Sequence, residues 1–393
     1  MAATTASQPI ILHFQNVPRV AGEIIAGTVD LNVALAQQER IEEVRIKFRG
    51  AITTRITTQN GQNSTTYGET IPLLHSNKVL WTPGSAFPPP DSHIVSLAFQ
   101  FQLPANLPPS FHCAARGRGG AISYSLEVVG DRPGIFRTNR RIRRVFSVVP
   151  AASQNQLRIN DSLRQGWLGP WRDIKRNEQL RQGIWGEYSR AALSLPDLPS
   201  FPITTPIPYI IHIVTETKTV DRTEQPADKH GKPLFPVPPA QSVNLQMNLR
   251  RTTQVRARTR TSHIDDTFDL QSVRHLPGPP RRRNVEALVD EPVWIPKEDS
   301  KDRGFWRRSV HFNSTLEFPY APTTSAETLN WIYALHFTFP FPGLGNDIKI
   351  QFPIHLGPST ACPPPPIGAA GTSNLTYADI PPAGPPPMLD LPP

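Results

Sequence analysis

The sequence predicts an all-β protein made of two immunoglobulin-like antiparallel β-sandwiches in tandem, followed by a proline-rich disordered tail. Three observations predict this class. Apolar residues alternate with polar ones over many short stretches, turn-forming clusters separate those stretches, and 45 of the 393 residues are proline. Alternation with a period of two is the pattern of a strand with one buried face. Proline inside a helix costs about 3 kcal/mol, so long helices are disfavoured.

The chain is expected to divide into four segments. We predict a first sandwich over residues 9–150, a linker with a short helix over 151–200, a second sandwich over 201–360 and a disordered tail over 361–393. A domain holds on the order of 150 residues, so this length suits two domains.

The first segment contains strand after strand. Three apolar residues at positions 44, 46 and 48 alternate with Arg45, Lys47 and Arg49, which gives one apolar face and one wet face. The run from Val95 to Leu103 alternates in the same way. Clusters such as Arg132-Pro133-Gly134 separate the strands, and this spacing is typical of an antiparallel sandwich.

Residues 151–200 interrupt the strand pattern. Trp171, Ile174, Ile184 and Tyr188 follow Pro170 at spacings that indicate a helix with basic residues on its other faces. Such a helix either lies on a membrane surface or connects the two domains with its tryptophans packed onto one of them. The irregular apolar face favours the connector.

Strand alternation resumes after Pro208 and predicts the second sandwich. It is clearest from Val243 to Leu249, and the connections are longer and more polar than in the first segment. From Pro363 onward the chain is mostly Pro, Ala and Gly, a composition that favours extended polyproline conformations and cannot bury a core.

The charge and the cysteine content of the sequence indicate in which compartment the protein acts and which partners it binds. The formal net charge is +9, which favours acidic partners such as phosphorylated segments, anionic lipid or nucleic acid. Only Cys113 and Cys362 are present, too few for a disulfide framework. The sequence has neither a signal-peptide pattern at its start nor an apolar run of membrane-spanning length, so we expect a cytoplasmic protein.

The sequence offers no catalytic motif. The histidines are scattered, none at the HExxH spacing, and the glycine clusters Gly117 to Gly120 and Gly343 to Gly345 lack the features of a phosphate-binding loop. There is no GxSxG elbow and no pair of carboxylates in a cluster. We therefore expect a protein that is not an enzyme and has no cofactor and no metal.

Arginine is the most informative residue type. One group flanks Ile142, and a second group alternates along one predicted strand so that its members project from one face. Guanidinium groups in such stripes bind carboxylates or phosphates, although like charges also keep exposed edge strands soluble. Nucleic acid is an unlikely partner, because interleaved aromatic residues and a recognition helix are lacking. The predicted partner-binding residues are Arg140, Arg141, Arg143, Arg144, Arg256, Arg258 and Arg260.

A resemblance to a known family rests on the first segment. It follows the run from Gly22 through Gly27 to Leu31 and the strand from Ile41 to Gly50. It continues in Phe101-Gln102-Leu103-Pro104, then in Leu107-Pro108-Pro109-Ser110-Phe111, and ends in the Ile122-Ser123-Tyr124 strand. In these residues the chain resembles the arrestin family, in particular its fungal arrestin-like members. Residues 201–360 are similar to the second arrestin sandwich in strand order and in the Pro208-Tyr209-Ile210 opening.

The resemblance implies a function. Arrestin-like proteins are cytosolic adaptors that bind cytoplasmic segments of membrane transporters or receptors and promote their ubiquitination and endocytosis. It therefore implies recruitment to the plasma membrane or endosomes, acidic or phosphorylated tails as partners, a HECT-type ubiquitin ligase as a further partner, and peripheral contact with anionic membrane.

One departure from the family concerns the ligase. Adaptors of this kind place Pro-Pro-x-Tyr segments in WW-domain grooves, and this sequence has no such motif. The sequence stops at Leu391-Pro392-Pro393, where two further residues ending in tyrosine would complete one. Either the chain is truncated at Pro393, or a ligase is recruited differently, or none is recruited. The alternative hypothesis is a trafficking scaffold of the retromer-subunit type with constitutive protein partners.

Overall fold

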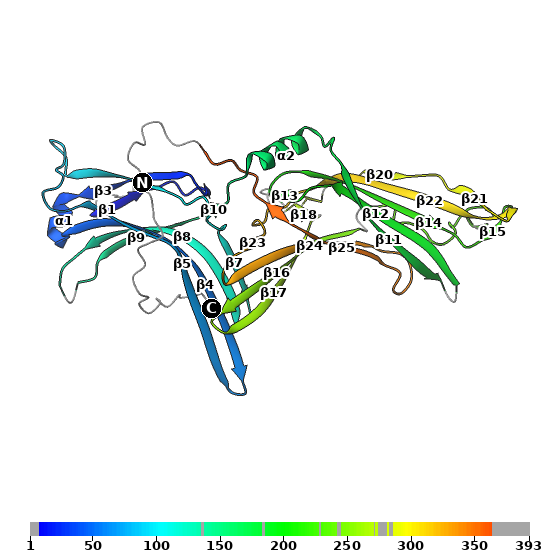
Figure 1. The fold of residues 1–393 in the computed structure, drawn as a ribbon, viewed down its shortest axis with the longest axis horizontal. Helices are drawn as coiled ribbons and strands as arrows, with labels where there is room; N and C mark the ends of the chain where they lie inside the picture. Colours follow the sequence, from blue (N-terminus) through cyan, green and yellow to red (C-terminus); the bar gives the residue numbers. More distant parts are fainter. Residues whose placement is uncertain are drawn as a thin grey trace.

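Strands in which buried and exposed residues alternate build both halves of the protein. The structure is a computed structural model. It describes residues 8–134, 137–182, 185–227, 229–241, 245–270, 272–273, 281–282 and 286–363. Figure 1 shows two β-sandwiches laid end to end, with the first half of the chain on the left and the second half on the right. The predicted all-β class and the two sandwiches are confirmed.

The N-terminal sandwich consists of a three-stranded and a five-stranded sheet. The three-stranded sheet has the order β1 (Ile10–His13), β3 (Ile24–Asn32), β6 (Ile94–Gln102). The five-stranded N-terminal sheet has the order β5 (Asn63–Trp81), β4 (Glu43–Asn60), β8 (Arg118–Asp131), β7 (Phe111–Ala115), and β9 (Arg140–Phe146) also pairs with β8. Smaller elements are β2 (Arg19–Val20), which pairs with β10 (Val148–Val149), and α1 (Val33–Glu39).

The alternation read from the sequence places the core of this sandwich. Phe48 is fully buried, and its ring centroid lies 5.6 Å from that of Phe101 and 5.8 Å from that of Phe146. Tyr124 is also fully buried, and its hydroxyl donates a 2.7 Å hydrogen bond to the carbonyl of Pro108. Because that carbonyl belongs to the proline turn before β7, the buried hydroxyl fixes the turn against the sheet.

The C-terminal sandwich is built in the same way from two larger sheets. The seven-stranded sheet has the order β11 (Trp171–Gln182), β12 (Trp185–Pro196), β14 (Ile207–Glu216), β22 (Ser300–Leu316), β15 (Val220–Asp221), with β20 (Glu286–Val289) and β21 (Val293–Lys297) also on β22. The other sheet has the order β17 (Arg260–Asp269), β16 (Gln246–Ala257), β24 (Leu329–Phe339), β23 (Thr324–Ser325), with β25 (Ile348–Ile354) also on β24. Two short pairs join β13 (Phe201–Pro202) to β26 (Leu356–Gly357) and β18 (Ser272–Val273) to β19 (Arg281–Arg282).

The helix predicted around Pro170 is wrong. Residues 171–182 and 185–196 form the hairpin of β11 and β12, paired from Trp171↔Pro196 onward within the seven-stranded sheet. Strand β11 lies at the edge of that sheet and most of its side chains are exposed, so its apolar residues keep no regular period. The second sandwich therefore takes in strands that the predicted division assigned to the linker.

The linker does contain a helix, but earlier in the chain. Helix α2 (Gln154–Gln165) starts at Ser153, whose hydroxyl accepts from the backbone N–H of Gln156, while the Gln156 side chain accepts from the backbone N–H of Ser153. This reciprocal pair is a capping box, and it satisfies two backbone groups that a helix start otherwise leaves without partners.

The two sandwiches pack directly on each other. The ring of Phe111, from the start of β7, stacks on that of Trp331, from β24, with centroids 3.8 Å apart. The guanidinium of Arg251 lies 4.7 Å from the centroid of the Phe111 ring and pairs with Asp266 at 2.7 Å. The buried apolar residues of both sandwiches form one continuous cluster. Phe111 thus joins the two sandwiches.

After β26 the chain returns toward the N-terminal sandwich (Figure 1). The carbonyl of Thr360 accepts a 2.8 Å hydrogen bond from the N–H of Ala152, and the carbonyl of Ser359 accepts one from the side chain of Asn160. The predicted tail over 361–393 lies outside the described residues from position 364 onward.

Candidate functional site: a basic face on the N-terminal sandwich

The outward face of the five-stranded N-terminal sheet gathers basic side chains from three strands. Strand register decides which of them are neighbours. Lys47 on β4 lies opposite Glu127 on β8, and Glu127 lies opposite Arg143 on β9. Directly paired residues of antiparallel strands share a face, so these three side chains form one row across the sheet.

Two parallel rows flank this one. The first runs through Arg45, Val129 and Arg141, and the second runs through His75, Arg49, Ser125 and Val145. Val129 and Ser125 are buried although they lie on the outward face, as expected where the stems of long basic side chains cover a sheet. We call this surface the basic face, and its basic members are Arg45, Lys47, Arg49, His75, Arg141 and Arg143.

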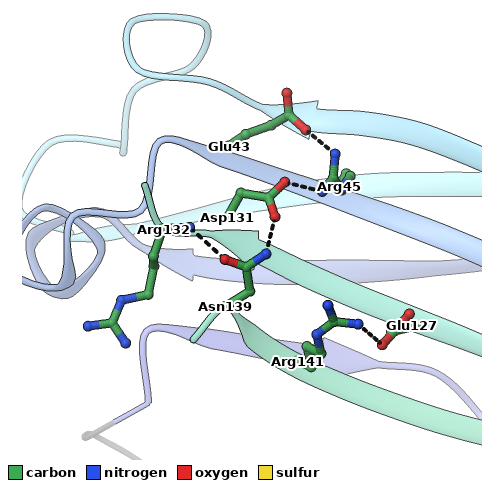
Figure 2. A network of polar contacts seen from close by, with 7 residues as sticks. All are labelled: Glu43, Arg45, Glu127, Asp131, Arg132, Asn139 and Arg141. Carbon is green, nitrogen blue, oxygen red and sulfur yellow. Dashed lines mark hydrogen bonds and ion pairs between the residues drawn. The ribbon is translucent and has the colours of Figure 1, made fainter. Parts of the chain in front are cut away.

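Carboxylates neutralise one end of the basic face (Figure 2). Arg45 pairs with Asp131 at 2.5 Å and with Glu43 at 3.4 Å. Asp131 is held in turn by the side-chain amide of Asn139, which donates at 2.5 Å. Arg141 donates a 3.1 Å hydrogen bond to Glu127.

The other end keeps its positive charge. Among the described residues, no carboxylate lies within ion-pair distance of Lys47, Arg49 or Arg143. Partial burial, and then the charges of Arg45 and Arg49, hold the pKa of Lys47 below its usual range. The pKa of His75 is lowered by burial and by Arg49 and Lys47. Cations crowded in this way repel one another, so an anion placed among them lowers their free energy.

Strand β9 carries the first predicted arginine group along the rim of the basic face. Arg140 lies at the start of the strand and forms two hydrogen bonds, of 2.6 and 2.8 Å, with the carboxylate of Glu39 at the end of α1. These bonds raise the pKa of Arg140 and lower that of Glu39. Arg143 and Arg144 are exposed and have no carboxylate partner within the part of the chain that the structure describes.

The second predicted arginine group lies elsewhere, at the junction of the two sandwiches. The expectation that Arg256, Arg258 and Arg260 alternate along one strand is wrong, because β16 ends at Ala257 and β17 begins at Arg260. Arg258 lies in the turn between them with a positive φ of 54°. Arg256 is paired with Thr261 and Arg260 with Ala257, so the two arginines point to opposite faces.

These junction arginines already contact the N-terminal sandwich. A guanidinium nitrogen of Arg256 lies 4.0 Å from a carboxylate oxygen of Glu69 on β5, and the backbone N–H of Arg258 donates to Glu69 at 2.6 Å. The guanidinium of Arg260 lies 5.4 Å from the centroid of the Tyr67 ring. Their role toward an outside partner stays a prediction.

Leu391, Pro392 and Pro393 lie outside the described residues. Within the described ranges, no group of three or more His, Cys, Asp or Glu side chains is placed to hold a metal ion. No helix in the same ranges is long and apolar enough to cross a membrane.

Four members of the basic face, Arg45, Lys47, Arg49 and His75, were not predicted as site residues. The alternation placed Arg45, Lys47 and Arg49 on a wet face, and nothing in the sequence placed His75 beside them. Their proximity to β9 arises from strand pairing, which joins residues up to about a hundred positions apart and leaves no local pattern.

Comparison with known proteins places the basic face inside a recognised domain. Residues 12–155 are similar to a family model described as "Arrestin (or S-antigen), N-terminal domain". The match includes β4, β5 and β9, the three strands that supply the basic side chains of the face. No curated protein matches the chain.

Proposed function

From the similarity of residues 12–155 to the N-terminal domain of the arrestin family, we propose a function for this chain. It is a non-enzymatic adaptor that binds acidic or phosphorylated cytoplasmic segments of membrane transporters or receptors and promotes their ubiquitination and endocytosis. Members of the family are generally non-enzymatic adaptors that bind the cytoplasmic tails of membrane proteins.

One observation supports the binding part of this proposal above the others. Lys47, Arg49 and Arg143 project from one face of the sheet without a carboxylate partner in the described chain. The net charge of +9 favours the approach of acidic segments, and the arginine forks then form charge-assisted hydrogen bonds with carboxylate or phosphate. The same charge suits peripheral contact with an anionic membrane, where such cargo resides.

Neutralising these three cations tests the proposal. The variant Lys47→Gln, Arg49→Gln, Arg143→Gln is compared with Arg158→Gln, Arg164→Gln, Lys229→Gln, which removes the same charge from exposed positions elsewhere. Binding of a fluorescent peptide with a run of Asp and Glu is measured by anisotropy at two salt concentrations. We expect at least about a tenfold weaker binding for the first variant only, and a weaker salt dependence.

Thermal unfolding serves as the control for folding. The three side chains are partly or fully exposed, so neutralising them leaves the unfolding temperature close to that of the parent protein. Equal binding by the two variants, with both folded, rules out the basic face as the binding surface.

The junction arginines and the ligase remain secondary parts of the proposal. A partner that binds Arg256 or Arg260 has to displace their contacts with Glu69, Glu327 and Tyr67, whereas Arg258 contacts Glu69 through its backbone N–H. For the ligase, a pull-down with WW domains of a HECT-type enzyme, with and without a tyrosine added two residues after Pro393, tests recruitment through this end. No finding supports the retromer-type scaffold.

A further inference from the structure

Strand β9 presents an open edge of the five-stranded N-terminal sheet. It pairs with β8 over its seven residues, from Gly130↔Arg140 to Tyr124↔Phe146, without a shift of register. Among the described residues no strand pairs with its other side. One row of backbone N–H and C=O groups therefore faces away from the sheet, and neither a proline nor a bulge interrupts it.

The side chains of this edge are basic on both faces. Neighbouring residues of a strand point to opposite faces, so Arg141 and Arg143 join the basic face while Arg140 and Arg144 lie on the side of Phe146. Arg144 is exposed although it points to the core side, so the opposing three-stranded sheet does not cover this part of β9.

We propose that the free edge of β9 binds its partner by strand addition, taking an extended peptide with consecutive carboxylates. The proposal rests on the proposed function and specifies how the acidic segment is held. Backbone hydrogen bonds to β9 supply the affinity that does not depend on sequence, and the arginines select the side chains. The order Arg-Arg-Ile-Arg-Arg over residues 140–144 calls for two acidic residues, one other residue and two more acidic residues.

The arginines on β9 are not explained by the general use of charged residues to protect edge strands from unwanted pairing. Strand β5 forms the opposite edge of the same sheet, and its exposed stretch near Thr65, Thr66, Gly68 and Thr70 has no positive charge at these positions. A row of arginines on an edge strand discourages neutral and basic strands in general, but it attracts an acidic strand selectively. Two of the four arginines, Arg140 and Arg141, already hold carboxylates at hydrogen-bond distance.

Backbone methylation of the peptide tests strand addition separately from charge. A synthetic peptide containing Glu-Glu-Val-Glu-Glu is compared with two N-methylated versions. One version is methylated at the odd-numbered positions, and the other is methylated at the even-numbered positions. An added strand uses the N–H groups of one register only. We expect the plain peptide and one methylated peptide to bind, and the other methylated peptide to bind at least about tenfold more weakly.

The outcomes separate the two proposals. If both methylated peptides bind as well as the plain one, strand addition is wrong while the adaptor function stands. If the plain peptide does not bind at all, the proposed acidic ligand is itself wrong.

Hydrogen exchange of the full chain locates the bound peptide. With the plain peptide we expect slower amide exchange across residues 140–146, and no such slowing with the weakly binding methylated peptide. The variant Arg143→Gln, Arg144→Gln is expected to lose binding at least about fivefold relative to the control Arg158→Gln, Arg164→Gln. Binding without protection of residues 140–146 contradicts the assignment to β9.

Discussion

At the scale of single residues, His75 is the member of the basic face whose side-chain type has the ordinary pKa closest to neutral pH. Burial and the charges of Arg49 and Lys47 lower its pKa, which means that the fold disfavours its protonated form. Its contribution to stability is therefore present above the unfolded pKa and is lost as the pH falls toward the lowered folded pKa.

The direction of the His75 pKa shift predicts how peptide binding depends on pH. A bound carboxylate favours the protonated imidazole, so binding is expected to take up protons and to strengthen as the pH falls from about 7.5 to 6. The slope of the binding constant against pH is measured as proton uptake, by titration calorimetry in buffers of different ionisation enthalpy. The variant His75→Gln is expected to flatten it, and an unchanged slope contradicts a role for His75.

At the scale of secondary-structure elements, β3 contains a glycine, Gly27, at a position where the neighbouring strands leave no room for a side chain. A Cβ atom built on Gly27 would lie 2.6 Å from the carbonyl oxygen of His13 on β1 and 2.6 Å from the ring of Phe99 on β6. The carbonyl belongs to the backbone and cannot move independently of β1.

Gly27→Ala is therefore expected to cost about 1–3 kcal/mol of unfolding free energy, because the three-stranded sheet has to shift. Denaturant unfolding measures the change. Gly61→Ala is a control without a steric neighbour, since nothing lies within 4 Å of a Cβ there, and its cost comes from its positive φ alone. A smaller loss for Gly27→Ala than for Gly61→Ala would contradict the packing argument.

The elements also show what could be predicted from the sequence. The strands of the N-terminal sandwich were predictable because alternation is local and one face is buried. Edge strand β11 was not, because its side chains are mostly exposed and its residues resemble a helix surface. The turn that separates Arg256 from Arg260 was missed because Arg258 adopts a positive φ with no glycine to mark it.

Within the candidate site the same distinction holds. The four arginines of β9 were predictable from their density in the sequence. Their proximity to Lys47, Arg49 and His75 was not, since it depends on three strand registers that only the folded sheet fixes. Glu39 and Glu127, which hold two of the arginines, are likewise brought in by the fold, from the end of α1 and from the neighbouring strand β8.

At the scale of the whole molecule, an aromatic and cationic cluster joins the two sandwiches. Phe111 is buried between the Trp331 ring, stacked at 3.8 Å, and the guanidinium of Arg251. Removing the ring leaves a cavity at the junction and takes a cation–π partner from Arg251.

Phe111→Ala is expected to cost about 3–5 kcal/mol and to change how the protein unfolds. Since the apolar cluster runs through both sandwiches, the parent protein is expected to unfold in one calorimetric transition, and the variant in two. Phe87→Ala removes the same ring from an exposed loop, where 78% of the residue is accessible, and is expected to leave the single transition intact. Two transitions in the parent would contradict this coupling.

The arginine order on β9 has a consequence for chain polarity. Arg-Arg-Ile-Arg-Arg reads the same from either end, so charge matching alone does not set whether an added strand runs parallel or antiparallel to β9. N-terminal and C-terminal cytoplasmic tails leave a membrane with opposite polarity. Under the proposed strand addition, an edge with this palindromic arginine order accepts both kinds of tail, and the residues that flank the acidic run of a tail then set its direction.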